Sequence, residues 1–111
     1  MTLSTRLTPA ELRAIESPVT AAAIKLRLGA VDDDLRETLA AVINVAYYIC
    51  KSTQRHAHLI PEIMRASDAA LDGYNDVDAL DGALEIYRAL IRTTPRKAIH
   101  KAINRALREN S

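Results

Sequence analysis

Alanine and leucine supply much of the apolar content of this sequence, whereas phenylalanine and tryptophan are absent. The 111 residues include 19 Ala, 13 Leu and 10 Ile, together with 4 Tyr. A core built from such side chains is thin, and it suits helices that pack closely on other helices. We therefore expect an all-α fold, a compact bundle of four to five helices.

The length and the balance of residue types are typical of one folded domain. Hydrophobic residues make up 49% of the chain and charged residues 26%, which is the composition of a globule rather than a disordered tail. We expect residues 1–7 to form a flexible N-terminus and residues 8–109 to form a single helical-bundle domain. No apolar run reaches the roughly 18 residues of a membrane span. Because the first six residues also lack the apolar core of a secretion signal, we expect a cytoplasmic protein.

Helix-start signals divide the chain. Residues Thr8–Glu11 read Thr-Pro-Ala-Glu, a capping box with proline at the first helical position. The apolar positions that follow keep one helical phase as far as Gly29, across Pro18, so the first helix is expected to be kinked or split at Pro18. Thr94 and Pro95 repeat the signal near the C-terminus, where we expect Thr94 to cap the last helix.

The middle of the chain predicts three more helices. Three aspartates, Asp32 to Asp34, favour a helix start, and the helix from about Asp33 to Ser52 is apolar nearly all round, which indicates a central position. Residues 54–58 form the first irregular stretch. A third helix opens at Pro61, and a fourth begins after Asn75 or Asp76, either of which is a suitable cap.

Charge is segregated along the chain although the total is only +1. Residues 59–91 carry seven acids and two bases, whereas residues 92–111 carry six bases and one acid. A basic helix of this kind can lie against a phosphate backbone. Phosphate contacts are then expected from the five cations of the last helix: Arg96, Lys97, Lys101, Arg105 and Arg108. The alternative is that the basic helix docks on the acidic segment and cancels its charge, or that both elements are solvated faces.

Two adjacent tyrosines, Tyr47 and Tyr48, flank the apolar stripe of the central helix. Exposed tyrosine is enriched at protein interfaces, so these two side chains are candidates for contact with a protein partner or with a second copy of the chain. The alternative is that both rings pack under neighbouring helices.

Groups for catalysis or metal binding are scattered. One cysteine, Cys50, falls inside an apolar run, and His56 and His58 lack a third ligand at a regular spacing. The acidic stretch from Asp72 does not match a calcium loop, because Val77 stands where that loop needs glycine. We therefore expect a non-enzymatic interaction or regulatory module, with no metal, cofactor or small-molecule substrate. The alternative function is a nucleic-acid-binding regulator that uses the basic C-terminal helix.

Three short segments carry a resemblance to known proteins. Residues Leu7–Leu12 (Leu-Thr-Pro-Ala-Glu-Leu), Asn44–Ala46 and Asp81–Leu84 resemble segments of small uncharacterised all-helical bacterial proteins. Some of those proteins are labelled as relatives of Fis-type DNA-binding regulators. The resemblance implies DNA binding through the C-terminal helix.

Overall fold

The computed structural model describes residues 6–109. Within this range the chain forms five α-helices and one short 3-10 helix, and no strand, which confirms the all-α prediction. The elements follow in this order: α1 (Pro9–Leu28), α2 (Asp33–Ser52), η1 (Gln54–Leu59), α3 (Ile60–Leu71), α4 (Val77–Thr93) and α5 (Arg96–Glu109).

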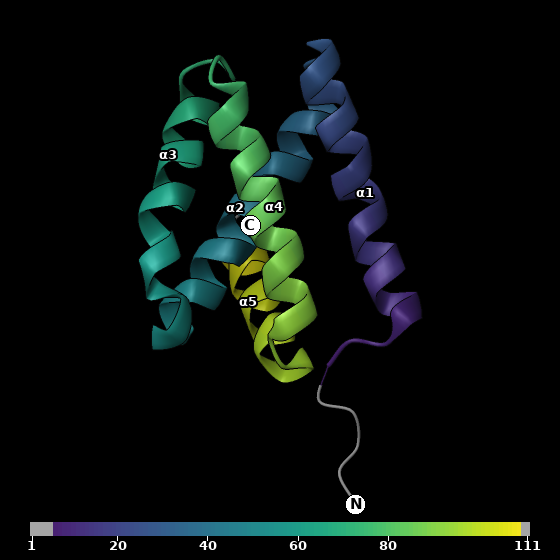
Figure 1. Ribbon diagram of the computed structural model, residues 1–111, viewed down its shortest axis with the longest axis vertical. Helices are drawn as coiled ribbons and strands as arrows, with labels where there is room; N and C mark the ends of the chain where they lie inside the picture. The colour runs from purple at the N-terminus through teal and green to yellow at the C-terminus, as the bar shows by residue number, and fades with distance from the viewer. Residues whose placement is uncertain (1–5, 110–111) are drawn as a thin grey trace, which may run out of the picture.

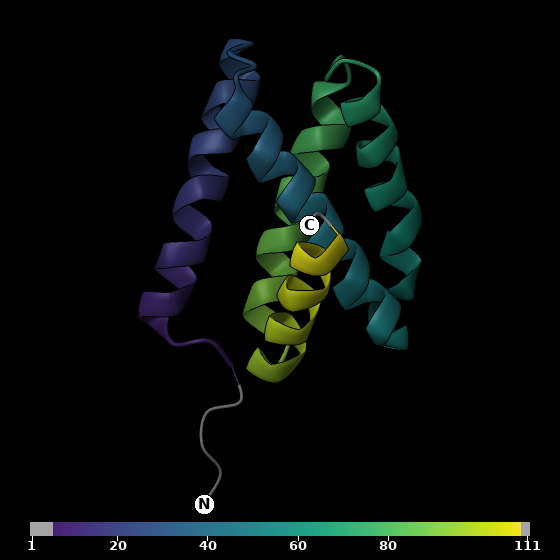
Figure 2. The same cartoon turned by 180° about the vertical axis from the view of Figure 1, so that it is seen from behind.

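The helices form two layers. In the first layer α4 lies between α3 and α1, as Figure 1 shows. The second layer holds α2, which runs diagonally across the first, and α5, which packs mainly on α2; both are in front in Figure 2. Because α2 contacts all four other α-helices, it is the central helix that the sequence predicted.

The core explains why α2 is apolar around most of its circumference. Leu35, Leu39, Ala46 and Ile49 of the predicted stripe are at most 1% exposed, and the buried residues of all five helices belong to one cluster. Leu7 joins this cluster at 6% exposure, although the prediction placed it in a flexible N-terminus. Residues 1–5 of that predicted segment lie outside the described residues.

Side-chain caps fix three helix starts where the sequence indicated them. Thr8 accepts from the Glu11 amide at 3.2 Å, and the Glu11 carboxylate accepts from the Thr8 amide at 2.9 Å, which confirms the capping box. Asp32 caps α2 by accepting from the backbone of Leu35 at 2.8 Å. Asp76, rather than Asn75, caps α4.

The structure corrects local predictions in three places, at Pro18 only in part. First, α1 is one continuous helix with Pro18 inside it, so it is not split; a bend at Pro18 stays a prediction. Second, Thr94 does not cap the last helix. Its hydroxyl is buried and makes no hydrogen bond within residues 6–109, while the Pro95 carbonyl accepts from Ala98 and Ile99 and starts α5. The stretch expected to be irregular forms η1 instead.

Candidate functional site

The fifth helix separates an apolar face from a charged one. Ile99, Ala102 and Ala106 are buried against the core, and α5 carries basic residues on its outer side. Ala102 and Ala106 are small, which lets α5 lie close against α2, and the exposed cations lie on the opposite side of the helix. The outer face of α5 is therefore the first candidate surface.

Arg96 does not belong to that outer surface. Its guanidinium forms an ion pair and hydrogen bond with Glu11, which ties the start of α5 to the start of α1. Hydrogen bonds from Thr8, together with the nearby Arg96 charge, lower the pKa of the Glu11 carboxyl. The prediction of Arg96 as a phosphate contact stays untested, but its charge already has an internal partner.

Lys97 and Lys101 lie one turn apart on the outside of α5. Both side chains are exposed, and neither makes an ion pair within residues 6–109. Arg105 and Arg108 continue the same side at the next turns and are also exposed. Four cations spaced by three or four residues share one side of a helix. We call these four residues, Lys97, Lys101, Arg105 and Arg108, the α5 basic surface.

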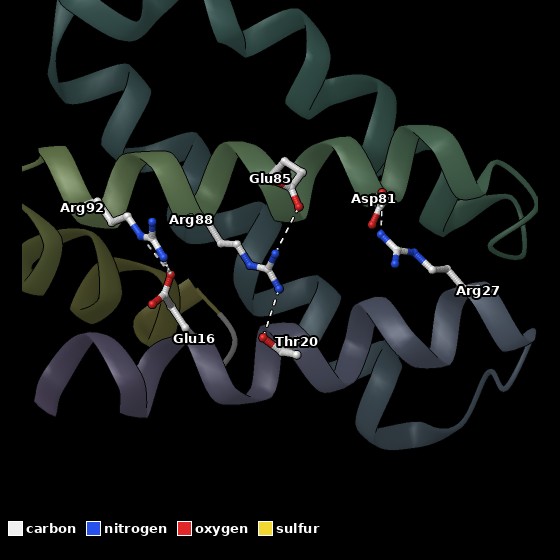
Figure 3. A network of polar contacts seen from close by, with 7 residues as sticks. All are labelled: Glu16, Thr20, Arg27, Asp81, Glu85, Arg88 and Arg92. Carbon is white, nitrogen blue, oxygen red and sulfur yellow. Dashed lines mark hydrogen bonds and ion pairs between the residues drawn. The ribbon is translucent and has the colours of Figure 1, made fainter. Parts of the chain in front are cut away.

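The α1–α4 contact shows where the bases around position 92 find partners. Arg92 pairs with Glu16 of α1 at 2.6 Å, and like the Arg96–Glu11 pair this contact joins a base near position 92 to a carboxylate of α1. In Figure 3, Arg88 and Arg92 reach from α4 toward α1, and Arg88 also bonds Glu85 of its own helix at 3.1 Å. Arg92 thus neutralises a carboxylate of α1, and Arg88 neutralises one of its own helix. Within residues 6–109, Lys97 and Lys101 make no ion pair with the acidic segment, so the alternative in which the basic helix docks on that segment is not seen for these two residues.

The two candidate tyrosines contact each other. The rings of Tyr47 and Tyr48 meet edge to face, with centroids 5.5 Å apart and planes at 68°, and both side chains are half-buried. Lys51 donates to the Tyr47 hydroxyl at 3.2 Å. The Arg105 guanidinium lies 4.6 Å from the centre of the Tyr48 ring, a cation–π arrangement. Tyr48 thereby contacts the α5 basic surface through Arg105, a contact that the sequence pattern did not indicate.

Beside Tyr48 the surface is hollowed. The hollow has a volume of about 260 Å³ and lies between the end of α2 and α5, with Lys101 and Arg105 on its α5 side. Burial, followed by a hydrogen bond and the charge of Glu109, raises the pKa of the Tyr48 hydroxyl. Ser52 and Thr53 also line the hollow, and nothing in their local sequence marks them as site residues.

The groups considered for catalysis or metal binding stay apart from the α5 basic surface. Cys50 is 1% exposed, and its burial raises the pKa of the thiol, which makes it a poor nucleophile. His56 lies in η1, where burial and the neighbouring Arg55 lower its pKa. Across residues 6–109, His, Cys, Asp and Glu side chains do not gather in groups of three or more that could hold a metal ion.

Within the same described range, no helix combines the length and the apolar character needed to cross a bilayer. Comparisons of the chain with family models, with curated proteins and with solved structures gave no match. The resemblance to Fis-type regulators therefore stays a prediction, and function has to be argued from the chain's own residues.

Proposed function

We propose that this protein is a non-enzymatic binding module that contacts a nucleic-acid backbone through the α5 basic surface. The observation that carries the proposal is the exposed pair Lys97 and Lys101, which have no carboxylate partner in residues 6–109 although the chain holds 14 acids. Arg105 and Arg108 extend this charge along the same side of the helix. Such a row of cations matches the regular negative charge of a phosphate backbone.

The expected binding is weak and sensitive to salt. A backbone contact releases condensed counterions, and the logarithm of the affinity falls by about 0.9 per contact for each tenfold rise in salt. With four contacts, the affinity for duplex DNA should fall by roughly 100-fold between about 50 mM and 200 mM salt. Sequence preference is expected to be small, because phosphate contacts position a protein without reading the bases.

The test is fluorescence anisotropy with a labelled duplex of mixed sequence at those two salt concentrations. The double substitution Lys97→Glu/Lys101→Glu should abolish binding. The matched control is Arg13→Glu/Arg55→Glu, which changes the net charge by the same amount at two exposed positions outside α5. Equal loss in both variants would show a general charge effect, and an affinity that does not change with salt would contradict the proposal.

A protein partner, or self-association, is the second candidate function. Tyr47 and Tyr48 favour it, because the two touching rings keep part of their surface exposed. The change to make is Tyr47→Ala, since Tyr48 also supports Arg105. Sedimentation should then show a loss of association; an unchanged association state and partner profile would remove this candidate. A cytoplasmic location fits either function and remains a prediction.

A further inference from the structure

The α5 side of the hollow beside Tyr48 carries two cations that can receive an anion. Lys101 and Arg105 line it from α5, one turn apart. The Arg105 guanidinium lies 4.6 Å from the centre of the Tyr48 ring, and its positive charge on this side of the hollow can pair with an anionic oxygen. The carboxylate of Glu109, near the Tyr48 hydroxyl, opposes an anion there.

The α2 side of the hollow offers hydrogen-bond acceptors. The hydroxyls of Ser52 and Thr53 both donate to the Ile49 carbonyl, at 3.0 and 3.1 Å. Each hydroxyl proton is therefore engaged within the protein, and the oxygen lone pairs remain for a donor. A ligand that contacts this side of the hollow has to bring hydroxyl or amine hydrogens of its own.

The hollow is small and partly apolar. Ala98 and Ala102 line it from α5. The volume of about 260 Å³ is below the range of sites for drug-sized ligands. One short unit with an anionic end and a hydroxylated end fits these dimensions and this polarity.

We propose that this hollow binds a phosphorylated sugar, with the phosphate at Lys101 and Arg105 and the sugar hydroxyls at Ser52 and Thr53. Two sources supply this chemistry: a free sugar phosphate, or a ribonucleotide unit of an RNA chain. Only the second source rests on the proposed function, since RNA would also lie along the rest of the α5 basic surface. A ribose 2′-hydroxyl is the donor that distinguishes RNA from DNA at such a site.

The experiment is calorimetry on the full chain with ribose 5-phosphate, inorganic phosphate and ribose as separate probes. Ribose 5-phosphate should bind at least about tenfold more tightly than either of the others, because it alone contacts both the α5 cations and the α2 hydroxyls. Ala98→Leu, which fills the hollow without changing its charge, should lower the affinity for ribose 5-phosphate by about tenfold. Lys101→Gln should do the same by removing a phosphate contact, whereas Glu109→Gln should tighten binding by removing an opposing charge.

The matched control is Lys97→Gln, which removes an exposed cation of the same helix that does not line the hollow. This variant should bind duplex DNA more weakly and bind ribose 5-phosphate with unchanged affinity. If ribose 5-phosphate binds while duplex DNA does not, the hollow is confirmed and the proposed function fails. Equal affinity for inorganic phosphate and ribose 5-phosphate, or no effect of Ala98→Leu, would overturn the sugar-phosphate site whatever happens to DNA.

The two sources separate with oligonucleotides. If single-stranded RNA binds more tightly than DNA of the same sequence, and Ala98→Leu removes that difference, the ligand is a unit of RNA. If ribose 5-phosphate binds and the RNA–DNA difference is absent, the ligand is a free sugar phosphate. If ribose 5-phosphate fails to bind and RNA and DNA bind equally, the site is not one for a sugar phosphate.

Discussion

Arg92 donates two hydrogen bonds to one carboxylate oxygen of Glu16, from Nε at 3.0 Å and from Nη2 at 2.6 Å. This pair joins α4 to α1 across 76 positions of sequence. Two further polar contacts join the same two helices: a hydrogen bond from Arg88 to Thr20 at 3.1 Å and an ion pair between Arg27 and an Asp81 oxygen at 3.9 Å (Figure 3). The buried residues of α1 are one valine, two alanines and one leucine, so polar links supplement a thin apolar contact.

The Arg92–Glu16 pair should stabilise the fold by a modest amount. A double-mutant cycle with Arg92→Ala and Glu16→Ala should give a coupling free energy of about 0.5–1 kcal/mol, because the Arg92 side chain is 61% exposed and water screens the charge. The coupling should shrink in high salt. Urea denaturation of the four proteins measures it.

The control cycle uses Arg36 and Asp33, a pair within α2 whose carboxylate side chain is 92% exposed. Its coupling should be smaller, about 0.3 kcal/mol, because the pair lies within one helix and is almost fully hydrated. Equal couplings in the two cycles would mean that the Arg92–Glu16 geometry adds nothing beyond an ordinary surface pair.

Local signals predicted the helix starts that depend on nearby residues. Thr8 with Glu11, and Asp32 with Leu35, interact over three positions, so the sequence alone contains both partners. The Glu11 partner of Arg96 lies 85 positions away, and no local pattern indicates it. The basic side of α5 was therefore predictable as a helical face, whereas its internally paired member and the hollow beside Tyr48 were not.

Thr94 shows how tertiary packing overrides a local signal. Its side chain is 2% exposed, and its hydroxyl has no hydrogen-bond partner in residues 6–109. A buried hydroxyl without a partner costs the free energy of its lost hydration. Thr94→Val keeps the shape and removes that group, so we expect the free energy of unfolding to rise by about 1 kcal/mol.

Urea denaturation checks the Thr94→Val expectation, with Thr94→Ser as the companion variant. Serine keeps the hydroxyl and loses a buried methyl group, so it should destabilise by about 1 kcal/mol. A destabilised valine variant would show that the Thr94 hydroxyl has a partner in solution, such as a buried water molecule.

Acid should weaken the start of α2. A hydrogen bond from Lys25, at 2.8 Å, and one from the Leu35 amide lower the pKa of Asp32 in the folded state. A carboxyl with a lowered folded pKa stabilises the fold above its unfolded pKa of about 3.9, and this contribution is lost as the pH falls through the folded pKa. Asp32→Asn keeps the cap but carries no charge. The melting temperature of this variant should therefore fall less than that of the parent protein between about pH 5 and pH 2.

The matched control for this acid loss is Asp33→Asn, which removes the neighbouring carboxylate that does not cap α2. Its pH profile should follow that of the parent protein. Lys25 gives a second check at alkaline pH, because the same hydrogen bond to Asp32 raises the pKa of the Lys25 ammonium group. Its contribution is complete below the unfolded pKa of about 10.4 and is lost as the pH rises through the higher folded value.

Gly82 and Gly29 should respond in opposite ways to the same substitution. A Cβ atom placed on either glycine meets nothing within 4 Å, so neighbouring atoms oppose neither change. Gly82 lies inside α4, where alanine is the better helix former, and Gly82→Ala should stabilise the protein by about 0.5–1 kcal/mol. Gly29 ends α1 at a φ of +71°, so Gly29→Ala should cost about 1 kcal/mol in backbone strain. Thermal melts that moved in the same direction for both variants would contradict this account of backbone conformation.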